Sequence, residues 1–140
     1  MRFETKILPV KYSYLAPDGS EIRLLPNVIG GGLAHCTIPS GCVSKPVYHK
    51  TVEEIWYFIE GQGEVWRNLN ELEEITDVYA GLSLTVPVAT KFQFRNTGAG
   101  PLRFIIATIP QWPGPQEAEE AVGAWTATET AGFGPSGETS

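Results

Sequence analysis

The chain has 140 residues, 42% of them hydrophobic, which is enough for one domain to bury a core without disulfides or a structural metal. Its 16 acidic and 10 basic side chains give a net charge of −6, which argues against nucleic-acid binding because that binding depends on cations that neutralise phosphates. No apolar run approaches the ~20 residues of a membrane span, and the first residues lack the apolar stretch of a signal peptide. We therefore expect a cytoplasmic protein without nucleic-acid or membrane partners.

The predicted elements are nearly all strands. Short runs rich in Val, Ile, Phe, Tyr and Trp are separated by Gly, Pro and Asn, and no long amphipathic helix pattern occurs. This pattern is typical of an all-β sandwich or barrel. In chain order, we predict strands at residues 6–14, 22–25, 33–38, 44–49, 54–60, 63–68, 73–78, 82–86, 91–96 and 102–108.

The composition changes after Pro110. Residues 111–115 are rich in proline and glycine, and residues 126–140 are mostly Thr, Gly, Ser, Ala and Glu. Such a sequence buries too little apolar surface to offset the entropy lost on ordering. We predict a barrel with its N-terminal strands over residues 1–112. A Pro/Gly-rich C-terminal segment over residues 113–140 should be largely disordered after about residue 126.

Two stretches that begin with glycine have a distinctive spacing. The first runs from Gly41 to Gly61 and places His49 and Glu54 five residues apart. That separation does not fit one helical face, where neighbours lie three or four residues apart. It fits the end of one strand and the start of the next, with both side chains directed to one interior. The second stretch runs from Gly81 to Asn96.

These stretches resemble the two conserved motifs of the cupin superfamily, Gly-x5-His-x-His-x4-Glu-x6-Gly and Gly-x5-Pro-x-Gly-x2-His-x3-Asn. Seven positions match: Gly41, His49, Glu54, Gly61, Gly81, Pro87 and Asn96. Three positions depart, because Val47 and Phe92 replace histidine ligands and Ala89 replaces a glycine. The resemblance implies a cupin-type double-stranded β-helix, that is, a jelly-roll barrel of two antiparallel sheets. It also implies a homodimer, with residues 3–14 available for strand exchange.

The resemblance and the alternation of side chains along strands together predict which residues face the barrel interior. The inward sets are those that contain His49, Glu54 and Phe92. Counting back from the turn at residues 39–41 places His35 inward as well. We expect His49 and Glu54 to be the catalytic residues, in a ligand pocket formed by His35, Val47, Trp56, Phe58, Phe92 and Phe94.

Two forms of this site are open. In the first, His35, His49 and Glu54 hold one divalent metal, since two imidazoles and a carboxylate suit Fe, Mn, Ni or Zn. In the second, His49 and Glu54 form a metal-free proton-transfer pair beneath an aromatic pocket, and His35 bonds a backbone carbonyl. The metal-free form is favoured because Val47 and Phe92 remove two ligands of the family pattern.

Three functions remain compatible with the sequence. The protein is a lyase, isomerase or oxygenase-type enzyme that binds a small organic molecule and acts through His49 and Glu54. Alternatively, it is a non-catalytic ligand-binding or sensor protein without metal. In the third case it is an accessory subunit whose cavity is filled by its own side chains. A small molecule is the expected partner in the first two cases, and the sequence does not name it.

Overall fold

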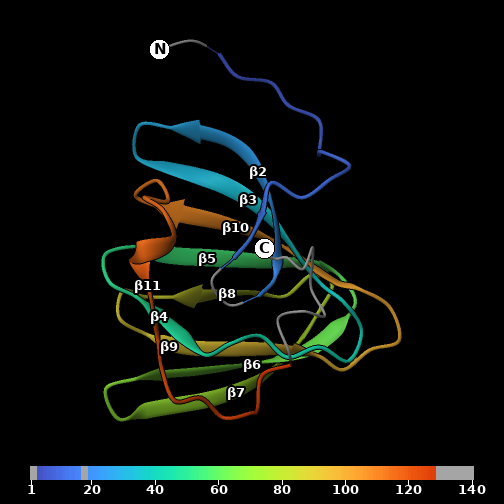
Figure 1. The fold of residues 1–140 in the computed structure, drawn as a ribbon, viewed down its shortest axis with the longest axis vertical. Coiled ribbons are helices and arrows are strands. Elements are labelled where there is room, and N and C mark those ends of the chain that lie inside the picture. Colours follow the sequence, from blue (N-terminus) through green and yellow to red (C-terminus); the bar gives the residue numbers. More distant parts are fainter. Residues whose placement is uncertain (1–2, 17–18, 129–140) are drawn as a thin grey trace.

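The computed structural model describes residues 3–16 and 19–128, and over these residues the protein is built almost entirely from strands. In this described part of the chain, eleven strands pair antiparallel into two sheets, and a single 3-10 turn, η1 (Pro115–Glu117), precedes β11. The two sheets face each other and enclose the core between them (Figure 1). The predicted all-β architecture of two antiparallel sheets is confirmed. Within the described residues, no helix is long and apolar enough to cross a membrane.

The two sheets are unequal. The first has six strands in the order β1 (Tyr14–Leu15), β2 (Glu21–Val28), β3 (Gly31–Ile38), β10 (Leu102–Ile109), β5 (Glu53–Glu60) and β8 (Ser83–Val86). The second has five strands in the order β11 (Ala118–Glu120), β4 (Val47–His49), β9 (Lys91–Asn96), β6 (Gln62–Leu69) and β7 (Leu72–Tyr79). Consecutive strands therefore often lie in opposite sheets, as β4 and β5 do.

The core is mainly aromatic. On β5 the side chains of Glu54, Trp56 and Phe58 are buried while Ile55 and Tyr57 are exposed, which is the expected period of two. Five rings from β5, β9 and β10 are almost completely buried and contact one another with centroids 4.7–6.2 Å apart: Trp56, Phe58, Phe92, Phe94 and Phe104. Such pairs contribute about 0.5–1.5 kcal/mol each beyond their buried area.

The motif glycines Gly61 and Gly81 lie in turns with φ of 91° and 99°, a region that disfavours residues with a Cβ atom. At Gly61 a Cβ would also contact the carbonyl oxygen of Pro101. Gly61 therefore permits both the β5–β6 turn and the close approach of the chain before β10.

The N-terminal segment differs from the prediction. Residues 3–13 form no strand, and the first strand is the short β1. Arg23 of β2 holds part of this segment by donating hydrogen bonds of 2.9 Å to the carbonyl oxygens of Pro9 and Val10. The remainder extends away from the sheets in Figure 1, with the side chain of Phe3 fully exposed. No described strand lies beside this apolar run, so its backbone cannot pair into a sheet.

The C-terminal segment adds a strand to the second sheet. Strand β11 pairs with β4, with Ala118 opposite His49, so the second sheet continues into residues 118–120. The backbone of Thr128 donates a 3.1 Å hydrogen bond to the carbonyl of Val43. Without β11, β4 would be an edge strand with unpaired backbone groups. Of the segment predicted to be disordered, residues 129–140 lie outside the described residues.

Candidate ligand-binding site

A cavity of about 60 Å³ lies between the two sheets. Its wall is formed mainly by β2, β3, β4, β5 and β10, and the C-terminal segment adds Trp112 and Ala118. Most of the lining is apolar, including Ile22, Leu24, Ala34, Val47, Trp56, Phe94 and Ile106. The lining also includes Ser20, Asn27, Cys36, His49, Glu54 and Thr108. A mostly apolar wall with few polar groups is the usual lining of a small-molecule site, and this cavity is smaller than the ~300–1,000 Å³ usual for drug-sized ligands.

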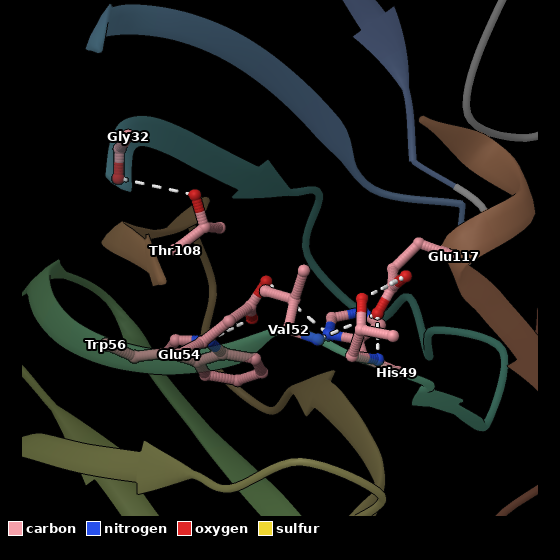
Figure 2. A network of polar contacts seen from close by, with 8 residues as sticks. Gly32, His49, Val52, Glu54, Trp56, Thr108 and Glu117 are labelled. Atoms are coloured by element: carbon pink, nitrogen blue, oxygen red, sulfur yellow. Dashed lines mark hydrogen bonds and ion pairs between the residues drawn. The ribbon is translucent and has the colours of Figure 1, made fainter. Parts of the chain in front are cut away.

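His49 and Glu54 face each other in this wall. His49 is the last residue of β4 and Glu54 the second residue of β5, so the turn between the strands brings both side chains to the cavity. The Nδ1 atom of His49 lies 3.6 Å from Oε2 of Glu54, and the residues are 6% and 5% exposed. Trp56 holds the carboxylate from the other side, donating a 2.8 Å hydrogen bond from Nε1 to Oε1 (Figure 2).

His49 is held in its neutral form. Burial lowers the pKa of its imidazole to about 4, and the charge of Glu117 opposes that shift only in part. The 3.6 Å separation from Glu54 is too long for a hydrogen bond, and Nδ1 has no hydrogen-bond partner in the described part of the chain. The ring is held instead by edge contacts with Phe92 and Trp112, at 5.1 and 5.0 Å between centroids.

Glu117 is a buried carboxylate that sequence reasoning missed. It belongs to η1 and reaches toward the turn between β4 and β5 (Figure 2), where it accepts hydrogen bonds from Thr51 N, Thr51 Oγ1 and Val52 N. Burial alone would raise the pKa of this carboxyl group, but the three hydrogen bonds, assisted by His49, lower it below the ordinary value. Glu117 therefore holds the C-terminal segment against the barrel, next to His49.

The predicted aromatic pocket is only partly assembled on the cavity wall. Val47, Trp56 and Phe94 line the cavity, whereas Phe58 and Phe92 are not among the residues on its surface. Both are fully buried in the aromatic core, and Phe92 contacts His49 and Trp56 from behind. Phe92 thus supports the site from the core side.

The structure differs from the prediction at His35. Ala34 and Cys36 line the cavity, so His35 between them points to the opposite face of the first sheet, where Arg23 and Ile105 are its cross-strand neighbours. Burial, and then the charges of Arg23 and Arg103, lower the pKa of His35. The sequence of β3 does indicate this direction of His35, because the alternating set of Ala34, Cys36 and Ile38 is more apolar than the set that contains His35.

These positions do not fit the predicted metal set. His35 is separated from His49 and Glu54 by the sheet itself, and Val47 and Phe92 carry no donor atoms. Within residues 3–16 and 19–128, no three His, Cys, Asp or Glu side chains are grouped so that they could hold a metal ion. The cavity wall offers the imidazole of His49, the carboxyl group of Glu54 and the thiol of Cys36, which are not grouped as a metal site and lack the second imidazole of the predicted set.

Comparison with known proteins identifies the family. The model of the cupin domain matches residues 34–108, so the chain belongs to the cupin family, and the resemblance of the two motifs is confirmed. A curated relative, an uncharacterized protein of Methanocaldococcus jannaschii, is 33% identical over 118 residues, which cover 76% of this chain and 90% of that protein.

Solved structures share the fold at lower identity. The capsular polysaccharide assembling protein CapF of Staphylococcus aureus superposes with a TM-score of 0.62 and 16% identity, over 81% of this chain and 33% of that chain. Oxalate decarboxylase of Bacillus subtilis, which contains Mn(II) centres, superposes with a TM-score of 0.60 and 18% identity, over 75% of this chain and 28% of that chain. This chain spans about a third of each structure, and these identities establish the fold alone.

Proposed function

We propose that the protein is a small-molecule cupin enzyme of lyase or isomerase type in which His49 and Glu54 transfer a proton. The observation that carries this proposal is the buried pair of a neutral imidazole and a carboxylate on the wall of an otherwise apolar cavity. Titratable groups with perturbed pKa values in a cavity are typical of catalytic sites. Lyase and isomerase reactions can proceed by proton transfer alone, whereas the oxygenase option would need metal ligands that Val47 and Phe92 do not supply.

Each residue has a defined part in this proposal. Glu54 acts as the general base, since Trp56 fixes one carboxylate oxygen and leaves the other directed at His49. His49 is neutral, so its ring carries one proton and one acceptor nitrogen. It can relay the proton that Glu54 removes once substrate binding shortens the 3.6 Å separation between Nδ1 and Oε2 to hydrogen-bond length. Phe92 and Trp112 hold the imidazole in place through their edge contacts. Excluding water from such a site strengthens these electrostatic interactions.

Proton exchange in heavy water tests the proposal. Hydroxyacetone and 2-butanone, incubated with the protein in D2O at pH 7.5, should exchange hydrogen at the carbon next to the carbonyl faster than in buffer alone. Glu54→Gln should abolish this acceleration, and Glu53→Gln, the same change on the exposed face of β5, should leave it intact. The exchange is followed by proton NMR. No acceleration with either compound at any protein concentration would contradict the proton-transfer role.

A non-catalytic ligand-binding or sensor role is the second candidate. Trp112 and Ala118 of the C-terminal segment line the cavity, so a ligand would contact that segment directly. Binding could then be transmitted to residues outside the barrel. Ligand-dependent chemical shifts at Trp112, without any exchange of ligand hydrogens, would favour this role over catalysis. The accessory-subunit hypothesis is disfavoured, because the side chains leave a cavity.

We propose that the site works without a divalent metal, because its donor set is incomplete. Elemental analysis of tag-free protein tests this proposal. Stoichiometric Fe, Mn, Ni or Zn that is lost in His49→Ala would contradict it, as would a melting temperature that rises when one of these metals is added.

We propose a homodimer formed through the outer face of the first sheet. Three consecutive outward side chains of β5, Ile55, Tyr57 and Ile59, are 48%, 50% and 41% exposed. The N-terminal segment, which Arg23 of β2 holds at Pro9 and Val10, carries the exposed apolar residues Phe3, Ile7 and Val10. A second copy related by a two-fold axis would cover both surfaces at once. Light scattering should show a dimer that Tyr57→Lys dissociates, whereas Ile75→Lys on β7 should have no effect. A monomeric wild type would contradict the proposal.

A cytoplasmic location stays a prediction. Cys36 and Cys42 are not joined by a disulfide, which is usual in a reducing compartment. Fractionation of the source cells tests the location, and recovery of the protein from the medium or cell surface would contradict it.

A further inference from the structure

The cavity wall has an acidic side chain but no basic one to balance it in the described part of the chain. Glu54 is the one acidic or basic residue, histidine aside, on the described part of the cavity wall, and no lysine or arginine side chain reaches it. The described arginines are engaged elsewhere: Arg23 with backbone carbonyls, Arg67 with Glu74, Arg95 with Glu64 and Arg103 with Glu60. An anionic ligand would therefore enter an apolar cavity without a cation to compensate it, close to a carboxylate.

A cationic ligand is disfavoured by the same surroundings. His49 reports on the cavity directly, since it lies in the wall with Glu54 3.6 Å away and Glu117 close behind. Even with these two carboxylates nearby, desolvation keeps the imidazole neutral. An ammonium group placed in the cavity would lose its hydration in the same way, and its three N–H donors would meet one carboxylate, of which Oε1 already accepts from Trp56, in a mostly apolar wall.

The size and polar groups of the cavity limit the ligand further. A volume of about 60 Å³ exceeds the ~10–15 Å³ that one water needs but is well below the ~150 Å³ of a cavity that encloses benzene, so only a few non-hydrogen atoms of the ligand can be enclosed. Val47, Phe94, Ile106 and Trp112 offer apolar surface to the body of such a molecule. The polar end has acceptor groups within reach, because the carboxyl group of Glu54 lines the cavity and Nδ1 of His49 has no hydrogen-bond partner among the described residues.

From these observations we infer that the ligand is a small uncharged molecule with a branched apolar body and one hydroxyl or amide N–H group that donates to the His49–Glu54 pair. Small carboxylates and amines are excluded from the site. This inference rests on the proposed function, since it assumes that the cavity binds a ligand, and it adds the chemical class of that ligand.

Three molecules of one shape test the inference. Isobutyramide, isobutyrate and isobutylamine share a branched apolar body and are neutral, anionic and cationic at pH 7.5. We expect isobutyramide to shift the NMR signals of Val47, Trp56 and Phe94 and to bind at least roughly tenfold tighter than either ion. In Glu54→Gln the preference for isobutyramide over isobutyrate should narrow, because the repelling charge is gone. Glu53→Gln has the same charge change outside the cavity and should keep the preference.

The outcomes separate the inference from the proposal beneath it. Isobutyrate or isobutylamine binding as tightly as isobutyramide, with shifts at the same three residues, would overturn the inference and leave a ligand-binding cavity standing. Failure of all three molecules to bind would overturn the proposed function as well. If Glu54→Gln does not fold, the three dissociation constants of the wild type decide the matter without it.

Discussion

Glu117→Ala is the most informative single change, because Glu117 links the C-terminal segment to the turn between β4 and β5, next to His49. The substitution removes an acceptor that is hydrogen-bonded to Thr51 N, Thr51 Oγ1 and Val52 N at 2.5–2.8 Å. It also leaves the two backbone donors near the protein interior without their partner. The contact is intramolecular but spans 65 and 66 positions in sequence, so local structure cannot replace it.

The expected cost follows from the number and type of these bonds. A hydrogen bond to a charged group contributes about 1.5–3 kcal/mol, and a buried donor left without its partner costs about 1–3 kcal/mol. The three bonds share one carboxylate and are not independent, so we expect a loss of about 3–5 kcal/mol in the free energy of unfolding. That is a large part of the ~5–15 kcal/mol available to a domain.

Urea denaturation at pH 7, followed by tryptophan fluorescence, measures this loss. Glu119→Ala is the matched control, since Glu119 is half-exposed and lies 3.5 Å from Lys50, a surface pair worth at most ~1 kcal/mol. Because the folded pKa of Glu117 lies below its ordinary 4.5, its contribution is complete above that pH and is lost as the pH falls through the folded pKa. Equal losses in the two variants would refute the buried role of Glu117.

Three further predictions concern the core, the second sheet and the site. Phe92→Ala should cost about 3–5 kcal/mol in chemical denaturation, the range for a buried aromatic ring, and a change within experimental error would place Phe92 outside the core. Gly63→Ala should cost about 1–3 kcal/mol because its Cβ would contact the carbonyl of Arg95, and a cost no larger than that of Gly30→Ala would disprove this contact. The pKa of His49 is lowered from 6.5 to about 4, so between these pH values the unfolded chain binds more protons than the folded one. Acidification through this range should therefore lower the free energy of unfolding of the wild type by roughly 3 kcal/mol more than that of His49→Gln. If the free energies of unfolding of the wild type and of His49→Gln fall in parallel as the pH is lowered, the lowered pKa of His49 is contradicted.

The sequence determined the fold, because the fold depends on local patterns. Alternation along β5 predicted that Glu54 and Trp56 face inward while Glu53 faces solvent, and the structure confirms this. Gly61 and Gly81 indicated turns, and both adopt positive φ. Side-chain parity along a strand and glycine conformations are properties of a few adjacent residues, so one sequence suffices to read them.

Tertiary structure decided most of the composition of the site. His35 was expected inside but lies buried on the outer face; both faces of β3 are covered near that position, so its apolar surroundings do not show the direction, and only the more apolar set of Ala34, Cys36 and Ile38 indicated it. Glu117 was not expected at all, because its partners Thr51 and Val52 are remote in sequence and belong to the turn after β4. Which polar groups meet in a cavity depends on how the sheets pack and where the chain ends cross them, and no local pattern records either.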